Sequence, residues 1–448
     1  MEMGTGKSKV VIDNVGVLYE RNDVDAVLIV APKGVYDNWV RGEIPLHLPD
    51  RIKRLVVRWT PSASKKFKGV LEALNKQPFD GVKFFVMNVE AFSSARGARA
   101  AGMFLYHNKN NMMVVDESTT IKNRKAQRTK NLMELTKYSK YRRILTGSPV
   151  TKSPLDLYSQ CNFLDERSLG YQSFFAFQNR YAIVQTRVMG ARSFQEITGY
   201  RRLDELNERL FSFSTRVLKD ECLDLPEKMY IRRNVPLTME QSKVYAQMNS
   251  LALAHLNDDK VATTASVLTQ IMRLQQICCG SFQPDVGDLQ ELKNKRLPEL
   301  MDIVDEVSGK AIIWATYTND IQRIAHALRD RFGPESVATY YGATPQKERQ
   351  EIVNRFQDED SPLRFFVGQP KTGGYGITLT AANTVIYYSN SYDLEIRLQS
   401  EDRAHRIGQR NPVTYIDLVS PNTIDETILD ALRNKINLAG QVLKEDVK

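Results

Sequence analysis

The sequence predicts an α/β protein with two lobes. Short apolar runs alternate with segments of helical period over its first 150 residues, and the same alternation returns after about residue 300. Runs of this kind, bounded by turn residues, are typical of buried strands in parallel sheets. The expected strands are 26–31, 84–89, 112–115, 144–145, 311–314, 336–341, 364–367, 385–388 and 413–418.

The segments between these runs predict the domain organisation. From about residue 154 the pattern changes to long aromatic and arginine-containing stretches with few strand signals, and after residue 239 it is strongly helical. The expected parts are 1–153 as lobe 1, 154–223 as a mostly helical insertion that completes it, 224–238 as an interlobe linker, 239–300 as a second helical insertion and 301–448 as lobe 2.

Composition narrows the class of protein. A chain of 448 residues with 42% hydrophobic and 26% charged residues has enough apolar material for two or three domains, which excludes wholesale disorder. No run reaches the ~18 apolar residues of a membrane helix, so we expect a cytoplasmic protein. The four cysteines have no C-x-x-C spacing, so no structural zinc is expected. A net charge of +9 favours a polyanionic partner.

The strongest local signal opens the chain, where Gly4, Thr5, Gly6, Lys7 and Ser8 precede a helical pattern. Glycines permit a tight turn whose backbone N–H groups face a phosphate, and the helix N-terminus adds its dipole. Lys7 would reach the outer phosphates of ATP, and the Ser8 hydroxyl would be a ligand of Mg²⁺. The alternative is a flexible terminus that merely contains glycines.

A second signal is an apolar strand that ends in two adjacent acids, Asp116 and Glu117. At the carboxyl end of a strand Asp116 can bind Mg²⁺, while Glu117 can polarise the attacking water. The alternative is a solvated turn.

Near the other end of the chain, Arg403 and Arg406 are three positions apart. On a helix they would share a face and could both reach a γ-phosphate as arginine fingers. Taken alone, the segment also fits a solvated charged helix.

Between residues 122 and 143 the chain has one acid, Glu134, among nine basic residues, a density that can neutralise several phosphates of a polyanion. The alternative is a solvated basic helix. The nine are Lys122, Arg124, Lys125, Arg128, Lys130, Lys137, Lys140, Arg142 and Arg143. Arginines and aromatics interleave again over 174–202, where we favour a core role for the aromatics.

Together these motifs resemble a Swi/Snf-type ATPase of helicase superfamily two, a family of double-stranded DNA translocases, and the resemblance covers almost the whole chain. The matching segments are 2–8, 29–39, 116–123, 145–149, 225–245, 274–280, 341–356, 373–379 and 403–409. The block Arg403-Ala404-His405-Arg406-Ile407-Gly408-Gln409 is the most specific of them.

The resemblance implies two RecA-like lobes with helical insertions, ATP between the lobes and duplex DNA across both, bound without sequence readout. It implies that Thr146, Gly147 and Ser148 couple hydrolysis to lobe movement and that Gly376 and Gln399 contact the nucleotide. Monomeric, compact relatives are common in bacteriophages and bacteria, so the resemblance suggests a role in DNA replication, recombination or repair.

The chain departs from the family pattern in two places. The phosphate loop begins at residue 2, so the strand and the adenine-reading segment expected before it are missing from these residues. Ser118 and Thr119 follow the acidic pair where many relatives have a histidine. Two alternatives stay open: a strand-separating or fork-reversing helicase, and a non-hydrolysing DNA-binding fragment. A hairpin or aromatic wedge would favour the helicase, and the sequence reveals none.

Overall fold

A computed structural model describes residues 1–62, 64–189, 192–257, 264–282, 288–373 and 376–444. The chain divides into two compact units. Unit 1 comprises Met1–Leu223 with Ile436–Lys448, and unit 2 comprises Asp224–Lys435. No helix of the described ranges is long and apolar enough to cross a membrane.

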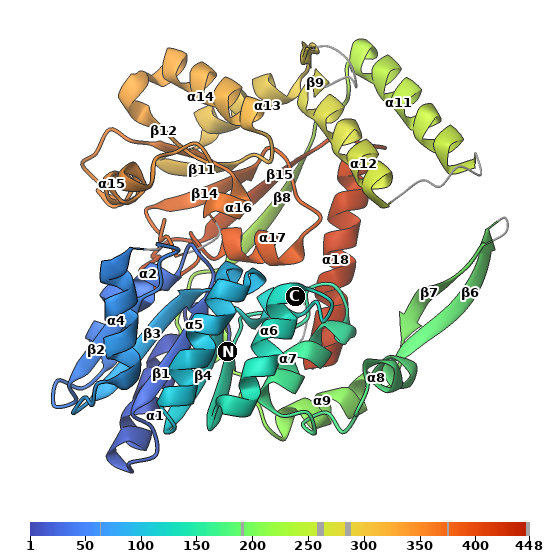
Figure 1. The fold of residues 1–448 in the computed structure, drawn as a ribbon. Coiled ribbons are helices and arrows are strands. Elements are labelled where there is room, and N and C mark those ends of the chain that lie inside the picture. The colour runs from blue at the N-terminus through green and yellow to red at the C-terminus, as the bar shows by residue number, and fades with distance from the viewer. Residues whose placement is uncertain (63, 190–191, 258–263, 283–287, 374–375, 445–448) are drawn as a thin grey trace. The chain divides into compact units, whose positions relative to one another are not determined.

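Unit 1 is built on a five-stranded parallel sheet in the order β2-β3-β1-β4-β5 (Figure 1). Its strands are β1 (Ala26–Ala31), β2 (Arg54–Arg58), β3 (Val82–Asn88), β4 (Asn111–Asp116) and β5 (Tyr141–Leu145). Every residue of β1 and β4 is buried, as expected for central strands covered on both faces. The edge strand β2, rich in arginine, was not expected from the sequence.

Alternate residues of β1 enter two separate cores, one on each face of the sheet. Leu28 and Val30 pack with Phe104 on one face, while Val27 and Ile29 pack on the other. The covering helices are α1 (Lys7–Glu20), α2 (Tyr36–Asn38), α3 (Ile44–His47), α4 (Lys65–Lys76), α5 (Ala95–His107) and α6 (Gln127–Leu135). A π-helical turn (Trp39–Glu43) and 3₁₀ turns (Val89–Ser93, Ser118–Ile121, Thr136–Tyr138) link them.

The segment expected to be a mostly helical insertion contains a long β-hairpin, so that expectation is wrong in part. After a 3₁₀ turn (Pro154–Asp156) come α7 (Leu157–Leu164), α8 (Phe174–Tyr181), β6 (Ala182–Met189), β7 (Arg192–Tyr200), α9 (Leu203–Phe211) and α10 (Lys219–Cys222). Closely spaced β-branched residues such as Ile183, Val184, Thr186 and Val188 favour strand here. The expected core role is confirmed for Phe177 and Tyr181, which are fully buried, whereas Phe175 is exposed.

Unit 2 has a six-stranded sheet in the order β12-β13-β11-β14-β15-β8, with every pair parallel. Its strands are β8 (Lys228–Asn234), β11 (Lys310–Trp314), β12 (Val337–Tyr340), β13 (Phe365–Gly368), β14 (Ala382–Tyr387) and β15 (Val413–Val419). The expected linker 224–238 therefore contains a strand. It pairs with β15 along its whole length, which supplies the backbone partners that a free linker would lack.

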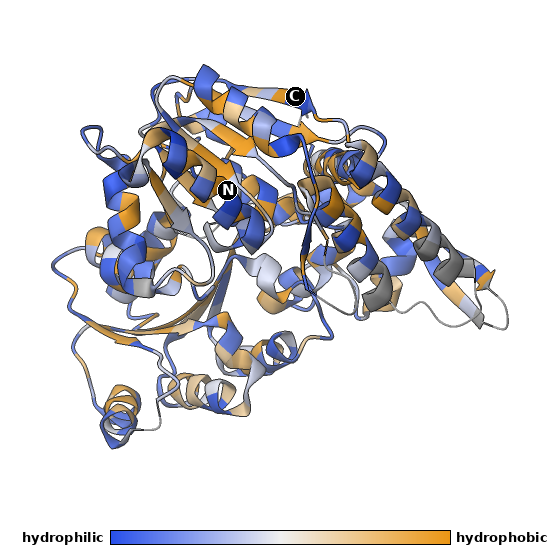
Figure 2. Ribbon diagram, turned by 90° about the horizontal axis from the view of Figure 1, so that it is seen from above, coloured by the Kyte–Doolittle hydropathy of each residue, from blue (hydrophilic) through white to orange (hydrophobic). Residues whose placement is uncertain are grey.

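The remaining elements of unit 2 are mostly helical. They are α11 (Met239–Asn257), α12 (Thr264–Cys279), the short pair β9 (Ser281–Phe282) and β10 (Gln290–Glu291), α13 (Arg296–Glu306), α14 (Thr318–Phe332), a 3₁₀ turn (Pro334–Ser336), α15 (Gln346–Gln357), α16 (Pro370–Gly373) and α17 (Leu394–Glu401). In Figure 2 several strands are strongly apolar, whereas the helices mix hydrophilic and hydrophobic residues.

The last helix, α18 (Ile424–Leu443), begins in unit 2, but its residues from Ile436 onward belong to unit 1. Val442 is fully buried in a cluster with Leu155 and Leu206. Its backbone carbonyl accepts a hydrogen bond from the side-chain amide of Asn207 at 2.8 Å. The expected second lobe, 301–448, therefore ends too late, because apolar residues of this segment complete the core under α7 and α9.

Candidate nucleotide and DNA sites

The phosphate loop has the backbone geometry that its glycines predict. Gly4 and Gly6 have φ angles of 82° and 89°, a left-handed conformation that favours glycine. Gly6 directly precedes α1, whose first turn leaves the amides of Lys7 and Ser8 without intrahelical acceptors. These donors at a helix N-terminus fit the phosphates of ATP.

The loop is folded around one of its own carbonyl groups. Lys7 Nζ and Thr5 Oγ1 each donate a hydrogen bond to the Glu2 carbonyl, both at 2.8 Å. The Lys7 side chain therefore lies over the loop. A phosphate held by the loop would be within its reach, as the family resemblance implies.

A segment that the sequence did not single out holds this loop in place. The Glu2 amide donates to the Val217 carbonyl at 3.0 Å, and the Lys219 amide donates to the Glu2 carboxylate at 2.7 Å. The Arg216 guanidinium donates to the Gly147 carbonyl at 3.4 Å, and burial lowers the pKa of Arg216. Nothing in the local pattern of this segment predicts a contact with residues more than 200 positions earlier.

Asp116 is the last residue of β4 and is 8% exposed. Its two oxygens accept hydrogen bonds from the Trp39 indole at 2.9 Å and from the Glu117 amide at 3.0 Å. Burial raises the pKa of Asp116, while the hydrogen bond from Trp39 and the charge of Lys7 oppose that rise. A carboxylate at a strand end, within the electrostatic reach of Lys7, fits the predicted role of Asp116 as a Mg²⁺ ligand beside a nucleotide.

Glu117 has φ 48° and ψ 64°, a left-handed conformation that costs a non-glycine residue energy. The turn after it is anchored by buried polar groups. The Ser118 hydroxyl donates to the Gln160 side-chain oxygen at 2.7 Å, and the Gln160 amide donates to the Pro149 carbonyl at 2.9 Å. Gln160 therefore connects the acidic motif to the segment after β5, a link that the sequence reasoning missed.

Thr146, Gly147 and Ser148, the predicted coupling residues, follow β5 directly. The Ser148 amide donates to Thr146 Oγ1 at 3.1 Å. Gly147 lies against the phosphate loop, since a Cβ atom placed on it would be 2.9 Å from Met3 Cγ and 3.4 Å from the Met3 amide nitrogen. The structure thus brings together the loop and the coupling segment.

The basic segment 122–143 is not one solvated helix. Lys122, Arg124, Lys125, Arg128 and Lys130 lie in the turn after β4 and the first half of α6. The other four follow α6 and enter β5. Because β5 is parallel to β4, this second group begins at the amino ends of the strands, whereas the first group follows the carboxyl end of β4.

Several of these basic residues already have partners within the protein. Lys122 Nζ donates to Thr151 Oγ1 at 2.6 Å, and the Arg124 guanidinium lies 4.4 Å from the centre of the Phe174 ring. Lys140 forms an ion pair with Asp23 at 2.9 Å, at the edge remote from Asp116. Lys125 and Lys130 are exposed.

Arg403 and Arg406 follow α17 instead of lying in it, because that helix ends at Glu401. The expected shared helical face is therefore absent. The Arg403 guanidinium is buried and donates to the carbonyls of Gln399 and Ile377 at 2.9 and 3.1 Å, whereas Arg406 is half-buried.

The two predicted nucleotide contacts of unit 2 differ in exposure. The Gln399 side chain is buried, and its amide donates to Glu395 at 3.4 Å. Gly376 is exposed and has a φ of 74°.

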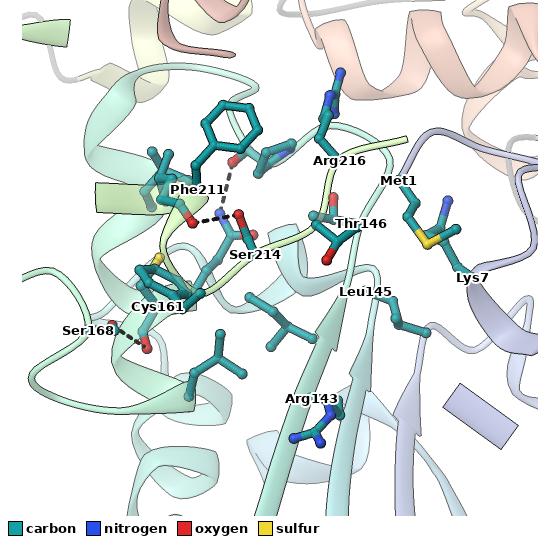
Figure 3. A pocket seen from close by; sticks show the side chains of 18 of the residues that line it. Met1, Lys7, Arg143, Leu145, Thr146, Cys161, Ser168, Phe211, Ser214 and Arg216 are labelled. Atoms are coloured by element: carbon teal, nitrogen blue, oxygen red, sulfur yellow. Dashed lines mark hydrogen bonds between the residues drawn. The ribbon is translucent and has the colours of Figure 1, made fainter. Parts of the chain in front are cut away.

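A cavity of about 660 Å³ lies in unit 1 beside β5, lined by residues of α1, α7, α9 and the end of α18. Figure 3 shows Met1, Lys7, Thr146 and Arg216 around it. Asp116 and Glu117, the predicted catalytic acids, are not among its lining residues. It runs along β5, which pairs within the described sheet with β4 alone.

Two family models together match most of the chain. Residues 1–283 match the SNF2-related domain, and residues 292–408 match the helicase conserved C-terminal domain. The chain is 26% identical over 429 residues to the putative ATP-dependent helicase/translocase YwqA of Bacillus subtilis, covering 94% of this chain and 43% of that protein. It is 25% identical to the DNA annealing helicase and endonuclease ZRANB3 of Bos taurus, covering 99% of this chain and 38% of that protein.

Among solved structures, the chain is 24% identical to the Sulfolobus solfataricus SWI2/SNF2 ATPase core in complex with dsDNA, with a TM-score of 0.40, covering 99% of this chain and 87% of that one. The chain spans less than half the length of the two curated relatives above. The SNF2-related match covers well over half of the chain, with the matched phosphate loop, acidic pair and coupling segment adjoining in unit 1. The chain therefore belongs to the family of proteins with an SNF2-related domain.

Proposed function

We propose that this chain is an ATP-dependent DNA translocase, which hydrolyses ATP and uses the cycle to move along duplex DNA without reading its sequence. One observation carries the proposal: in unit 1 the phosphate loop, through Met3, contacts the coupling residue Gly147 directly. Gln160 joins that same segment to the acidic motif. A movement of the phosphate loop can therefore pass through Gly147 to the segment after β5, and through Gln160 to the acidic motif.

In the proposed mechanism the amides of the loop and Lys7 hold the phosphates, and Ser8 and Asp116 would hold Mg²⁺. The metal neutralises phosphate charge when bound. Glu117 orients and polarises the attacking water, and its left-handed backbone fixes the direction in which its carboxylate leaves the strand end. Arg406 stabilises the charge that develops on the transferred phosphate. Arg403 keeps that role in the proposal, but its bonds to Gln399 and Ile377 also give it a structural one.

DNA is the proposed polyanionic partner. Lys125 and Lys130 are exposed in the segment that follows the acidic pair, so phosphate contacts there lie within one turn and one short helix of the catalytic residues. We place the activity in DNA replication, recombination or repair. The name of one relative, a DNA annealing helicase and endonuclease, is consistent with that setting.

Steady-state ATP hydrolysis tests the proposal, measured without DNA, with single-stranded DNA and with duplex DNA. We expect duplex DNA to stimulate hydrolysis and Glu117→Gln to reduce the stimulated rate by about 10²- to 10⁴-fold, because the variant keeps the shape of the side chain but loses its basic oxygen. Duplex binding by that variant should be unchanged. Binding without any hydrolysis in the unmodified chain would instead favour a DNA-binding fragment.

A further inference from the structure

The β6–β7 hairpin is an arm whose outer part no other described part of unit 1 covers. Its strands pair only with each other, from Ala182 opposite Tyr200 to Met189 opposite Arg192. Eight residues of strand extend about 26 Å, and in Figure 1 the hairpin stands away from α8 and α9. Only its root is anchored, by buried Tyr181 and Ala182. An isolated two-stranded hairpin is marginally stable in water, so its length calls for another explanation.

The outer part of the arm carries an exposed apolar side chain on each face. Val188 is 75% exposed and Phe194 is 47% exposed. Phe194 lies opposite Arg187 and Val188 opposite Ser193, so the two apolar side chains are on different faces of the hairpin. Both lie close to the turn at 190–191, which is outside the described residues. An arm that packed one face on a protein surface would need only one apolar face.

The two strands of the arm carry few charges. Arg187 and Glu196 form an ion pair with each other, and β7 begins with a further arginine, Arg192, whose side chain is outside the described ones. The remaining described polar side chains are neutral, among them Gln185, Thr186 and Gln195. A surface with so few charges and with exposed apolar side chains suits stacking on the faces of bases, while Arg192 can contact a neighbouring phosphate.

The root of the arm adjoins the segment proposed to hold phosphates. Helix α8 runs directly into β6. The Arg124 guanidinium lies 4.4 Å and 5.4 Å from the ring centres of Phe174 and Phe175, at the start of α8. Arg180, at the end of α8, is held by an ion pair with Glu205. DNA bound along the basic segment therefore lies beside the start of α8, the helix that leads into the arm.

We infer that the β6–β7 arm is a wedge for branched DNA: its apolar outer end stacks against the base pair exposed where a duplex forks. Apolar side chains that enter a base step unstack it at a cost of a few kcal/mol, and that cost is lowest where stacking is already interrupted. The inference rests on the proposed function and names its substrate as a fork or junction. A wedge of this kind is the feature that would favour the strand-separating alternative, and the sequence alone did not reveal it.

The test uses the double variant Val188→Ser with Phe194→Ser, which removes the apolar groups from exposed positions and should leave folding intact. Leu46→Ser is the matched control, because Leu46 is an apolar residue of unit 1 that is 76% exposed and lies in α3. Binding is measured without ATP on a forked duplex with 2-aminopurine at the branch point and on a linear duplex of the same length.

We expect the unmodified chain and Leu46→Ser to raise the 2-aminopurine fluorescence at the fork. The double variant should lose this response and bind the fork about tenfold more weakly, with linear-duplex affinity within about twofold of normal. With ATP, displacement of a strand from the fork should fall about tenfold, while ATPase stimulated by linear duplex is kept.

Three results would overturn the inference. One is no fluorescence change with the unmodified chain, which would leave a protein partner as the occupant of the arm. Another is an unchanged response in the double variant. The third is an equal loss of fork and linear-duplex binding, which would make the arm a general duplex contact. The fluorescence readout needs no hydrolysis, so it stands apart from a failure of the proposed ATPase.

Discussion

Glu117 combines a proposed catalytic role with backbone strain. The acidic pair after an apolar run was visible in the sequence, but the left-handed backbone of its second member was not, because glutamate normally avoids that region. Backbone strain of about 1–3 kcal/mol persists only where surrounding contacts impose it. Here the buried Ser118–Gln160 hydrogen bond follows directly after the strained residue. The strain is consistent with the catalytic role proposed for the carboxylate.

Gly147 gives a prediction at the same scale. In Gly147→Ala the new methyl group would lie 2.9 Å from Met3 Cγ and 3.4 Å from the Met3 amide nitrogen, so Met3 must shift, and we expect the phosphate loop that carries it to move with it. A displacement approaching 1 Å costs up to about 100-fold in rate. We expect kcat to fall by about 10- to 100-fold with DNA affinity unchanged, measured by duplex-stimulated ATPase and DNA binding. Gly69→Ala is the control, since a Cβ there meets nothing within 4 Å. Normal turnover in Gly147→Ala would show that Met3 yields without moving the loop.

At the scale of elements, the basic segment shows the difference between a charge count and a surface. The nine basic residues are close in sequence, but α6 carries the chain about 14 Å back along the sheet, so they separate into two groups. The group that follows β4 remains beside the acidic pair. The group that enters β5 is at the other edge, where Lys140 pairs with Asp23.

This separation predicts unequal effects of charge reversal on DNA binding. Lys125→Glu should weaken duplex binding about tenfold and reduce the slope of log affinity against log salt by about one, as expected for the loss of a phosphate contact. Lys137→Glu, an equal charge change at an exposed position of the other group, should change neither. Titrations at several salt concentrations measure both. Equal slopes for the two variants would contradict the assignment of DNA to the first group.

At the scale of the whole chain, the end of α18 belongs to the unit that contains the start of the sequence. Val442 is fully buried beside Leu155 and Leu206, and its carbonyl accepts the Asn207 amide hydrogen bond. The helical period of 424–443 predicts an apolar stripe but does not indicate which hydrophobic core that stripe packs against. The sequence therefore did not predict that the end of α18 belongs to unit 1.

Val442→Ala should therefore destabilise unit 1. Removing two methyl groups from a fully buried valine is expected to cost about 2 kcal/mol. Hydrogen exchange followed by mass spectrometry should show faster exchange in α7 and α9 and no change in the sheet of unit 2. Val70→Ala is the control, since Val70 is 39% exposed in α4. Faster exchange confined to unit 2 would be incompatible with the packing of α18 described above.

The sequence by itself determined the elements whose signals are local. The alternation of apolar runs and helical segments predicted the α/β class and most strands of both sheets, since period and turn residues act over a few positions. The glycine loop, the acidic pair and the arginine block were likewise recognisable in the sequence, and their chemical roles are predictions made from it. The hairpin was missed because apolar and polar residues do not alternate regularly along its strands. Strand β8 was missed because prolines flank it, so that the segment resembled a linker.

The tertiary structure alone decided which of these parts meet. The Glu2 carboxylate accepts a bond from an amide 217 positions away, Gln160 links two motifs, and the end of α18 joins unit 1. Contacts of this kind depend on how distant surfaces pack and satisfy buried polar groups, and no local pattern encodes them.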